Sequence, residues 1–276
     1  MTEVPQSSDT CYRHPDRQSY VLCQRCGRTI CPECQTQAAV GVHCPECVAE
    51  ARQRAPKRKP AIVTAFSRSS SRPVVTYSLM AICAIVFALQ FITADVVTQW
   101  LAYIPVYTAA QPWRMVTAIF LHGSILHLLF NMYALFIFGP MLESMLGRIR
   151  FLALYLIAGF AGSVAVLVLA PGTAVVGASG AIFGLFSAFF VIQRRLGGNA
   201  TQLLIIIALN LAIGFFVPNV AWQAHLGGLI VGALIALIFM RTRRADQQRL
   251  QIALVGSTAL GLVVITVFTA MRLGLM

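Results

Sequence analysis

The sequence GASGAIFG at residues 177–184 opens a long apolar run with small residues, and it places the hydroxyl of Ser179 where a membrane-spanning helix should begin. On its own, a Gly-x-Ser-Gly pattern favours helix packing over catalysis, because small residues let membrane helices approach closely. Polar side chains inside other apolar runs change that balance, since ionisable groups are costly in lipid and are often functional there. They belong to His122, His127, Asn131 and His225.

The composition predicts an all-α polytopic membrane protein. Of the 276 residues, 58% are hydrophobic and only 11% are charged, more apolar surface than a soluble core would bury. The net charge of +12 does not indicate nucleic acid, because seven of the 21 basic residues lie between Arg52 and Arg72, directly before the first long apolar run. This position fits cytoplasmic anchoring of a membrane protein. The first 20 residues are polar, so we expect no cleavable signal peptide.

Residues 11–47 contain four pairs of metal-ligand residues, each pair separated by two residues. Two tetrahedral zinc ions need eight ligands, and eight are present. We expect interleaved pairing, in which the first and third pairs hold one zinc ion and the second and fourth pairs hold the other. Such cross-links would stabilise a segment too small to fold on its own core. The pairs are Cys11 and His14, Cys23 and Cys26, Cys31 and Cys34, and Cys44 and Cys47.

Other interpretations of this segment stay open. The pairing order can differ, His43 can replace one of the last two ligands, and the cysteines can form disulfides or bind a single ion. A reducing cytosol disfavours disulfides. The segment resembles the B-box type of zinc finger, an interaction module in its relatives. No ligand position is left for water, so we expect the zinc to be structural.

Seven apolar runs follow, each near the ~20 residues that cross a bilayer. Basic residues follow the second, fourth and sixth runs, whereas the connectors Pro171–Val176 and Pro218–Val220 carry no charge. The positive-inside rule then predicts seven helices, with the amino terminus in the cytoplasm and the carboxyl terminus outside. The aromatic-rich connector 95–116 should lie at the outer interface. The runs are 74–94, 117–142, 150–170, 177–193, 202–218, 221–240 and 251–271.

This topology brings the polar residues to similar depths. The second, fourth and sixth helices enter from the outer face, and Ser179 and His225 lie near the start of two of them. At 1.5 Å per residue, the polar side chains should fall within about 10 Å of one another in depth. Small residues repeat at four-residue spacing on both of these helices, which allows the close contact that a Ser–His hydrogen bond requires. These residues are Gly180, Gly184 and Ala188, and Gly228, Gly232 and Ala236.

The residue types fit nucleophilic catalysis. A serine hydroxyl needs a base to accept its proton, and His225 is the candidate. The resulting oxyanion needs hydrogen-bond donors, which His127, Asn131 and the backbone N–H of Ser179 can supply. No Asp or Glu lies at comparable depth in the predicted helices, so we expect a dyad without an acidic third member.

Each residue also has a structural interpretation. His225 can be a packing residue, and His122 is expected to be structural or interfacial. Phe183, one turn after Ser179, either stacks on His225 or is an ordinary core aromatic. Glu143 is expected to pair with Arg148 or Arg150 at the inner end of its helix.

Taken together, five motifs resemble the signature of the rhomboid intramembrane serine proteases, in order and spacing. The zinc-finger extension suggests an actinobacterial-type member of the family. The chain departs from the family pattern at Phe183, where the best-known bacterial members have Tyr. The motifs are Trp113-Arg114, His122-x4-His127-x3-Asn131, Gly139-x3-Glu143-x3-Gly147, Gly177-x-Ser179-Gly180 and Ala224-His225-x2-Gly228-x3-Gly232.

The resemblance implies a domain organisation. Residues 1–50 would be a cytoplasmic zinc module and residues 51–72 a flexible basic linker. Residues 73–240 would form a six-helix rhomboid core, and residues 241–276 a cytoplasmic loop and a seventh helix. The protein would reside in the plasma membrane.

The resemblance also implies the activity, which is hydrolysis of peptide bonds in or near transmembrane segments of other proteins. Ser179 would be the nucleophile, His225 the general base and acid, and His127 and Asn131 oxyanion stabilisers. Expected partners are membrane-protein substrates, the bilayer and a protein that binds the zinc module, but not nucleic acid. An inactive relative that binds clients is the alternative. Structural positions near the site would be His122, Gly177, Gly180, Phe183, Gly228, Gly232 and Glu143.

Overall fold

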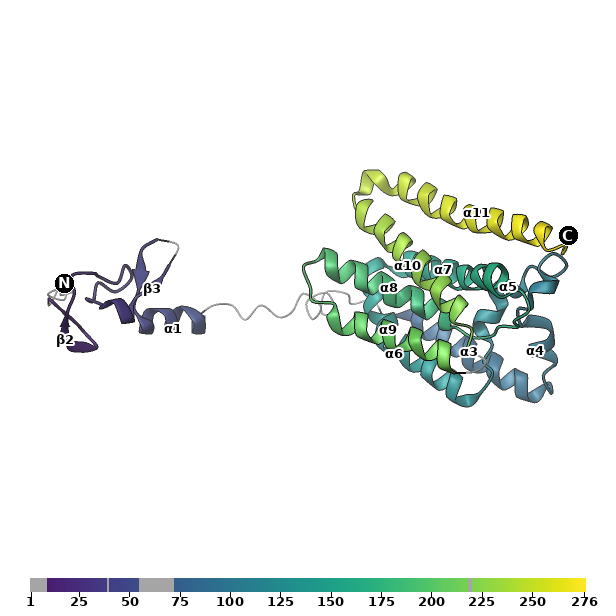
Figure 1. Cartoon of the computed structure of the whole chain (residues 1–276), viewed down its shortest axis with the longest axis horizontal. Helices are drawn as coiled ribbons and strands as arrows, with labels where there is room; N and C mark the ends of the chain where they lie inside the picture. The colour runs from purple at the N-terminus through teal and green to yellow at the C-terminus, as the bar shows by residue number, and fades with distance from the viewer. Residues whose placement is uncertain (1–8, 39, 55–71, 218–219) are drawn as a thin grey trace. The chain divides into compact units, whose positions relative to one another are not determined.

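The computed structural model describes residues 9–38, 40–54, 72–217 and 220–276. The chain divides into two compact units, Met1–Val63 and Thr64–Met276 (Figure 1). Most of the predicted basic linker, residues 55–71, lies outside the described residues, as do Pro218 and Asn219 of one uncharged connector. The first residues of that predicted linker are helical, because a helix that begins at Pro45 runs to Arg54.

The first unit is a small cysteine-rich fold. Among its described residues, the buried side chains are six cysteines and Ile30, with two polar residues, Ser19 and Thr29. Since this core is far smaller than a stable domain needs, cross-links through the cysteines would stabilise the unit. Its elements are β1 (Thr10–Cys11) paired antiparallel with β2 (His14–Gln18), β3 (Thr36–Gln37) paired antiparallel with β4 (Val42–His43), the 3₁₀ helix η1 (Pro32–Cys34) and α1 (Pro45–Arg54).

The second unit is a helical bundle, and each predicted apolar run overlaps one of its long helices. Within the described residues, five segments are long and apolar enough to cross a membrane, while α8 and α9 have 17 and 16 residues. The chain is therefore a multi-pass membrane protein, as predicted. The long helices are α3 (Val74–Ile92), α6 (Ile125–Leu146), α7 (Arg148–Leu169), α8 (Ser179–Arg195), α9 (Thr201–Phe216), α10 (Trp222–Arg241) and α11 (Gln248–Arg272).

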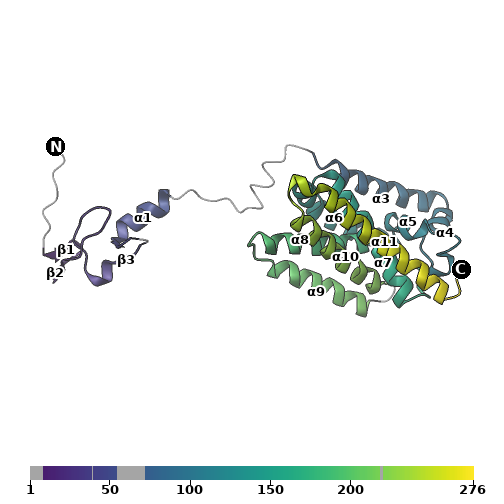
Figure 2. The same ribbon diagram turned by 90° about the horizontal axis from the view of Figure 1, so that it is seen from above.

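Helix α8 lies at the centre of this bundle, because all of residues 180–189 are buried. It packs against α7 and α10, while α11 packs on the outside of α7 and α10 (Figures 1 and 2). The glycine repeats account for the closeness of α8 and α10. A Cβ atom at Gly228 would overlap the carbonyl oxygen of Gly180, and one at Gly232 would overlap the backbone of Gly184.

The second predicted run begins too early. The chain forms short helices at α5 (Arg114–Thr117) and η3 (Ala118–Phe120), and α6 begins only at Ile125. The reason is a local cap that hydropathy does not reveal, since the Ser124 hydroxyl accepts a hydrogen bond from the backbone N–H of His127 at 3.2 Å. His122 therefore lies in the loop before α6.

The connector between α3 and α5 contains only α4 (Val96–Leu101) and the 3₁₀ helix η2 (Pro105–Tyr107). With six residues, α4 extends about 9 Å, too little to span a bilayer. Trp100, Tyr107 and Trp113 are exposed, as a segment at an interface requires. Its placement at the outer surface of a membrane stays a prediction.

The predicted pairing of Glu143 with Arg148 or Arg150 is wrong. Glu143 is buried and accepts hydrogen bonds from the backbone N–H groups of Val75 (3.0 Å) and Thr76 (2.8 Å) and from the Thr76 hydroxyl (2.7 Å). It thus satisfies free N–H groups in the first turn of α3. Arg148 and Arg150 instead donate to other groups: the carbonyl oxygen of Arg72 and the side chain of Gln251.

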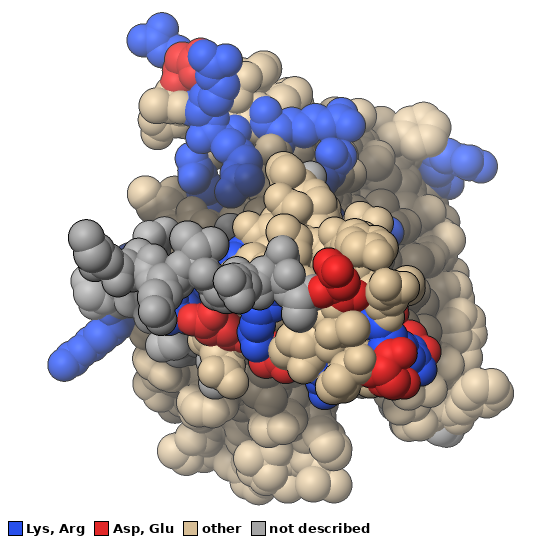
Figure 3. Space-filling model, turned by 90° about the vertical axis from the view of Figure 1, so that its left-hand side faces the viewer, with Lys and Arg blue, Asp and Glu red and all other residues tan. Residues whose placement is uncertain are grey.

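Arginines gather at one end of the bundle. Figure 3 looks toward this end and shows arginine side chains grouped on the surface. The opposite end is where α6, α8 and α10 begin. This asymmetry is what the positive-inside rule describes, and the cytoplasmic location of the arginine-rich end remains our prediction. The arginines are Arg148 and Arg150 at the start of α7, Arg194 and Arg195 at the end of α8, and Arg241, Arg243, Arg244 and Arg249 around the turn from α10 to α11.

Candidate functional site

Ser179 and His225 contact each other directly. Ser179 is the first residue of α8, and His225 lies in the first turn of α10. The distance from His225 Nε2 to Ser179 Oγ is 2.9 Å, which suits a hydrogen bond. The glycine contacts between Gly180 and Gly228 bring the two helix backbones close enough for this bond to form.

The His225 ring is held by an aromatic neighbour. Phe183 stacks on it with ring centroids 4.2 Å apart and an angle of 7° between the planes, so Phe183 is a stacking partner. The buried Nδ1 atom of His225 has no hydrogen-bond partner within the described residues. In that part of the chain the two residues therefore form a pair without an acid.

His127 and Asn131 come from α6 and lie beside this pair. Gly177 has a φ of +125°, and a Cβ atom there would lie 2.6 Å from His127 Cε1, so only glycine suits this position. Asn131 is buried, and its Nδ2 donates to the carbonyl oxygen of His127 at 2.8 Å. One N–H of its amide remains for another acceptor.

His122 contacts His127 edge to face, with ring centroids 5.2 Å apart. Its side chain is 1% exposed, and neither ring nitrogen has a partner among the described residues. A buried imidazole normally binds a partner or an ordered water. His122 is therefore a buried neighbour of His127.

Our reading of the sequence missed Gln90. This residue of α3 holds the loop before α6, because its Oε1 accepts from the backbone N–H of His122 (3.0 Å) and its Nε2 donates to the carbonyl oxygen of His122 (3.2 Å). The available signal was an amide in the otherwise apolar run 74–94, since polar groups are costly in lipid.

A cavity of about 670 Å³ opens onto Ser179 and His225. His127 and Asn131 also line it. Most of the other lining residues are apolar, and they come from α6, α8, α9 and the segments that precede α8 and α10. It is large enough for several residues of a peptide and combines apolar walls with a few polar groups, as ligand sites do.

The cysteine-rich unit contains two candidate metal centres, and their grouping is the interleaved pairing predicted from the sequence. Cys11, His14, Cys31 and Cys34 form one group, in which the ligand atoms lie within 4.8 Å of one another. His14 Nδ1 lies 3.8 Å, 3.4 Å and 3.5 Å from the three sulfurs. Zinc bonds of ~2.0 Å to nitrogen and ~2.3 Å to sulfur give tetrahedral edges of about 3.5 Å, so these residues fit zinc.

Cys23, Cys26, Cys44 and Cys47 form the second group. The sulfurs of Cys26 and Cys44 are 3.7 Å apart, a zinc-site edge and far from the ~2.05 Å of a disulfide. All eight cysteines are free, and His43 is in neither group.

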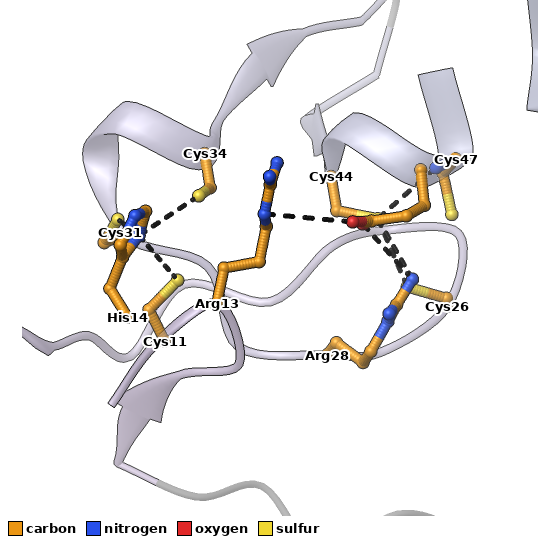
Figure 4. A network of polar contacts seen from close by, with 10 residues as sticks. Cys11, Arg13, His14, Cys26, Arg28, Cys31, Cys34, Cys44 and Cys47 are labelled. Atoms are coloured by element: carbon orange, nitrogen blue, oxygen red, sulfur yellow. Dashed lines mark hydrogen bonds and ion pairs between the residues drawn. The ribbon is translucent and has the colours of Figure 1, made fainter. Parts of the chain in front are cut away.

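Arg28 neutralises charge at the second group. It donates to the sulfurs of Cys26 (3.3 Å) and Cys44 (3.5 Å), and the hydrogen bond to Cys26 raises the pKa of its guanidinium. Figure 4 shows the first group and three cysteines of the second, Cys26, Cys44 and Cys47, with Arg13 between them. Arg13 and Arg28 both form ion pairs with Glu46. Four thiolates around a bound divalent ion would leave excess negative charge, which the guanidinium of Arg28 would offset.

The helical unit is similar in sequence to known rhomboid proteins. A family model described as Rhomboid domain matches residues 109–242. YdcA of Bacillus subtilis (strain 168) is 35% identical over 181 residues, which cover 62% of this chain and 90% of YdcA. Rhomboid protease GluP of the same organism is 43% identical over 129 residues, 45% of this chain and 25% of GluP. RHOMBOID-like protein 6, mitochondrial, of Arabidopsis thaliana is 39% identical over 137 residues, 47% of this chain and 44% of that protein.

Proposed function

Because this chain belongs to the rhomboid family, we propose that it is a serine endopeptidase that hydrolyses peptide bonds in or near transmembrane segments of other membrane proteins. The observation that carries the proposal is the 2.9 Å contact between Ser179 Oγ and His225 Nε2 at the cavity wall. A hydroxyl in hydrogen-bond contact with an imidazole is the arrangement that makes serine nucleophilic.

In the first half of the reaction, His225 Nε2 accepts the Ser179 proton while Oγ attacks the carbonyl carbon of the substrate. The carbonyl oxygen becomes an oxyanion. The C–N bond then breaks, and His225 transfers its proton to the leaving amine, which leaves an acyl ester on Ser179. In the second half, water attacks the ester, again with His225 as base, and Ser179 recovers its proton.

The oxyanion needs donors that are in place before the reaction. The backbone N–H of Ser179 is available, because the first N–H groups of a helix have no acceptor within it. The second N–H of the Asn131 amide and the His127 ring lie along the same cavity. These three donors form the oxyanion site of the proposal.

The site also requires a conformational change in the substrate. An intact helix keeps its backbone carbonyls in hydrogen bonds, so the segment to be cut must unwind to expose one to Ser179. Small or helix-breaking residues near the cut are therefore expected. Water needed for the second half of the reaction can be held by His122, whose ring nitrogens have no partner among the described residues.

We further propose that the two cysteine groups bind two zinc ions, which supply structural cross-links when bound. Each group already provides four ligands, so no position remains for a catalytic water. A folded unit that precedes the membrane core is suited to binding a protein partner. In this proposal the zinc module and the basic linker are cytoplasmic, and the carboxyl terminus lies outside the plasma membrane.

The test separates an active protease from an inactive relative that binds membrane clients. A fluorophosphonate probe should label the wild-type protein, whereas Ser179→Ala and His225→Ala should each lose both labelling and cleavage of a model transmembrane substrate. Both variants should keep the wild-type thermal unfolding temperature. Retained cleavage in either variant would refute the dyad, and a wild-type protein that neither labels nor cleaves would support the client-binding alternative.

A further inference from the structure

Helix α9 carries a single polar side chain in its apolar stretch. From Leu203 to Phe216, every residue except Asn210 is apolar or glycine. An amide inside a membrane is costly unless it finds a hydrogen-bond partner. The Asn210 amide therefore needs hydrogen-bond partners, and its own helix satisfies only part of its hydrogen-bonding capacity.

The Asn210 side chain lines the cavity that contains Ser179 and His225. Ile213 and Val217, three and seven residues later, line it too, so these residues define the face of α9 turned to the cavity. The Nδ2 atom of Asn210 donates to the carbonyl oxygen of Ile206 at 2.8 Å. Among the described residues, its Oδ1 atom accepts no hydrogen bond. Because Asn210 is also exposed, this acceptor remains free for a group outside the chain.

The depth of Asn210 follows from helix geometry. Short connectors join the helices from α6 to α10, so consecutive helices run antiparallel, and α9 ends where α8 and α10 begin. Asn210 lies six residues before the last residue of α9, and Ser179 is the first residue of α8. At 1.5 Å per residue, Asn210 is about 9 Å deeper in the bundle than Ser179.

An unwound substrate strand would connect these two levels. An extended chain advances ~3.3 Å per residue, so a strand with its cleaved bond at Ser179 reaches the level of Asn210 about three residues away. The walls around it are largely apolar, with Asn131 of α6 as the other amide of the cavity. A polar substrate side chain at this level would therefore find few partners other than Asn210.

Resting on the proposed protease function, we infer that Asn210 is a specificity residue. It accepts a hydrogen bond from an amide or hydroxyl side chain of the substrate, about three residues from the cleaved bond on the side that runs into the bundle. Substrates with Asn, Gln, Ser or Thr at that level are preferred over those with an aliphatic residue.

The experiment compares two model transmembrane substrates that differ only at the residue proposed to contact Asn210, which is Asn in one and Leu in the other. The comparison is repeated with this residue placed two, three and four positions from the cleaved bond. The wild-type kcat/KM should favour the Asn substrate by about 3- to 20-fold, the range that hydrogen bonds inside membranes provide. Asn210→Leu should remove the preference, so that the kcat/KM values for the two substrates become equal. Leu209→Ala is the matched control, since Leu209 is exposed and is not among the residues that line the cavity.

Several outcomes overturn the inference. A preference that survives in Asn210→Leu, or an equal loss on both substrates, shows that Asn210 does not read the side chain. Chemical cross-linking measures the oligomeric state of Asn210→Leu. If this variant changes the oligomeric state and keeps the substrate preference, Asn210 instead pairs helices of two copies of the chain. If the wild-type protein is labelled by the probe and cleaves both substrates equally well, this inference is overturned and the proposed function stands. If the wild-type protein is neither labelled nor cleaves a substrate, the proposed function is overturned as well.

Discussion

Replacing Gly228 with alanine should separate the two groups of the dyad without touching either. A Cβ atom there overlaps the carbonyl oxygen of Gly180, whereas non-bonded atoms settle near ~3.5 Å, so the backbones of α8 and α10 must part by about 1 Å. His225 lies three residues before Gly228. The distance between Nε2 and Oγ, 2.9 Å in the wild type, would grow to about 3.9 Å, beyond hydrogen-bond range.

A displacement of this size at a catalytic pair lowers kcat by about 10²-fold. The assay measures kcat on a model transmembrane substrate together with the rate of fluorophosphonate labelling at Ser179. Both should fall in Gly228→Ala, and the thermal unfolding temperature shows whether the variant is folded.

Two glycines provide a graded comparison. A Cβ atom at Gly180 would lie 3.2 Å from the carbonyl oxygen of Ala224, and one at Gly256 of α11 meets nothing within 4 Å. Gly180→Ala should therefore lose less activity than Gly228→Ala, and Gly256→Ala should behave like the wild type. Wild-type kcat in a folded Gly228→Ala variant would refute the claim that backbone contact sets the distance between serine and histidine.

Three further predictions concern separate parts of the chain. Asn131→Ala should lower kcat by about 10²- to 10³-fold if its amide stabilises the oxyanion, and an unchanged kcat would remove Asn131 from the site. Glu143→Gln should lower the free energy of unfolding by about 1–3 kcal/mol, because buried N–H groups of α3 lose a charged acceptor; denaturant titration in detergent measures this, and unchanged stability would show that the cap is dispensable. The purified full-length chain should contain two zinc ions by elemental analysis, and Cys31→Ser should contain fewer; a wild-type chain without zinc would contradict the metal centres.

Much of the architecture can be read from local patterns. Apolar runs of membrane-spanning length predicted the seven long helices because hydropathy is a property of consecutive residues. The spacing of the cysteines and His14 identified the eight residues of the two candidate metal centres, since ligand pairs two residues apart are a local feature. Patterns with a four-residue period, such as Gly180 and Gly184, indicated which helix faces approach closely.

Contacts between distant segments could be established only by the folded chain. Glu143 lies 67 residues from Thr76, and no sequence pattern links these two residues. For Ser179 and His225, which are 46 residues apart, the patterns predicted proximity, but the 2.9 Å distance is a property of the folded chain. The hydrogen bonds between Gln90 and the backbone of His122 were not predicted, because these residues are also far apart in the sequence. For the same reason, the sequence left the grouping of the candidate metal ligands open, and the folded chain shows it. Hydropathy and spacing record what each segment requires of its surroundings, whereas the identity of the partner depends on which segments the packing of the whole bundle brings together.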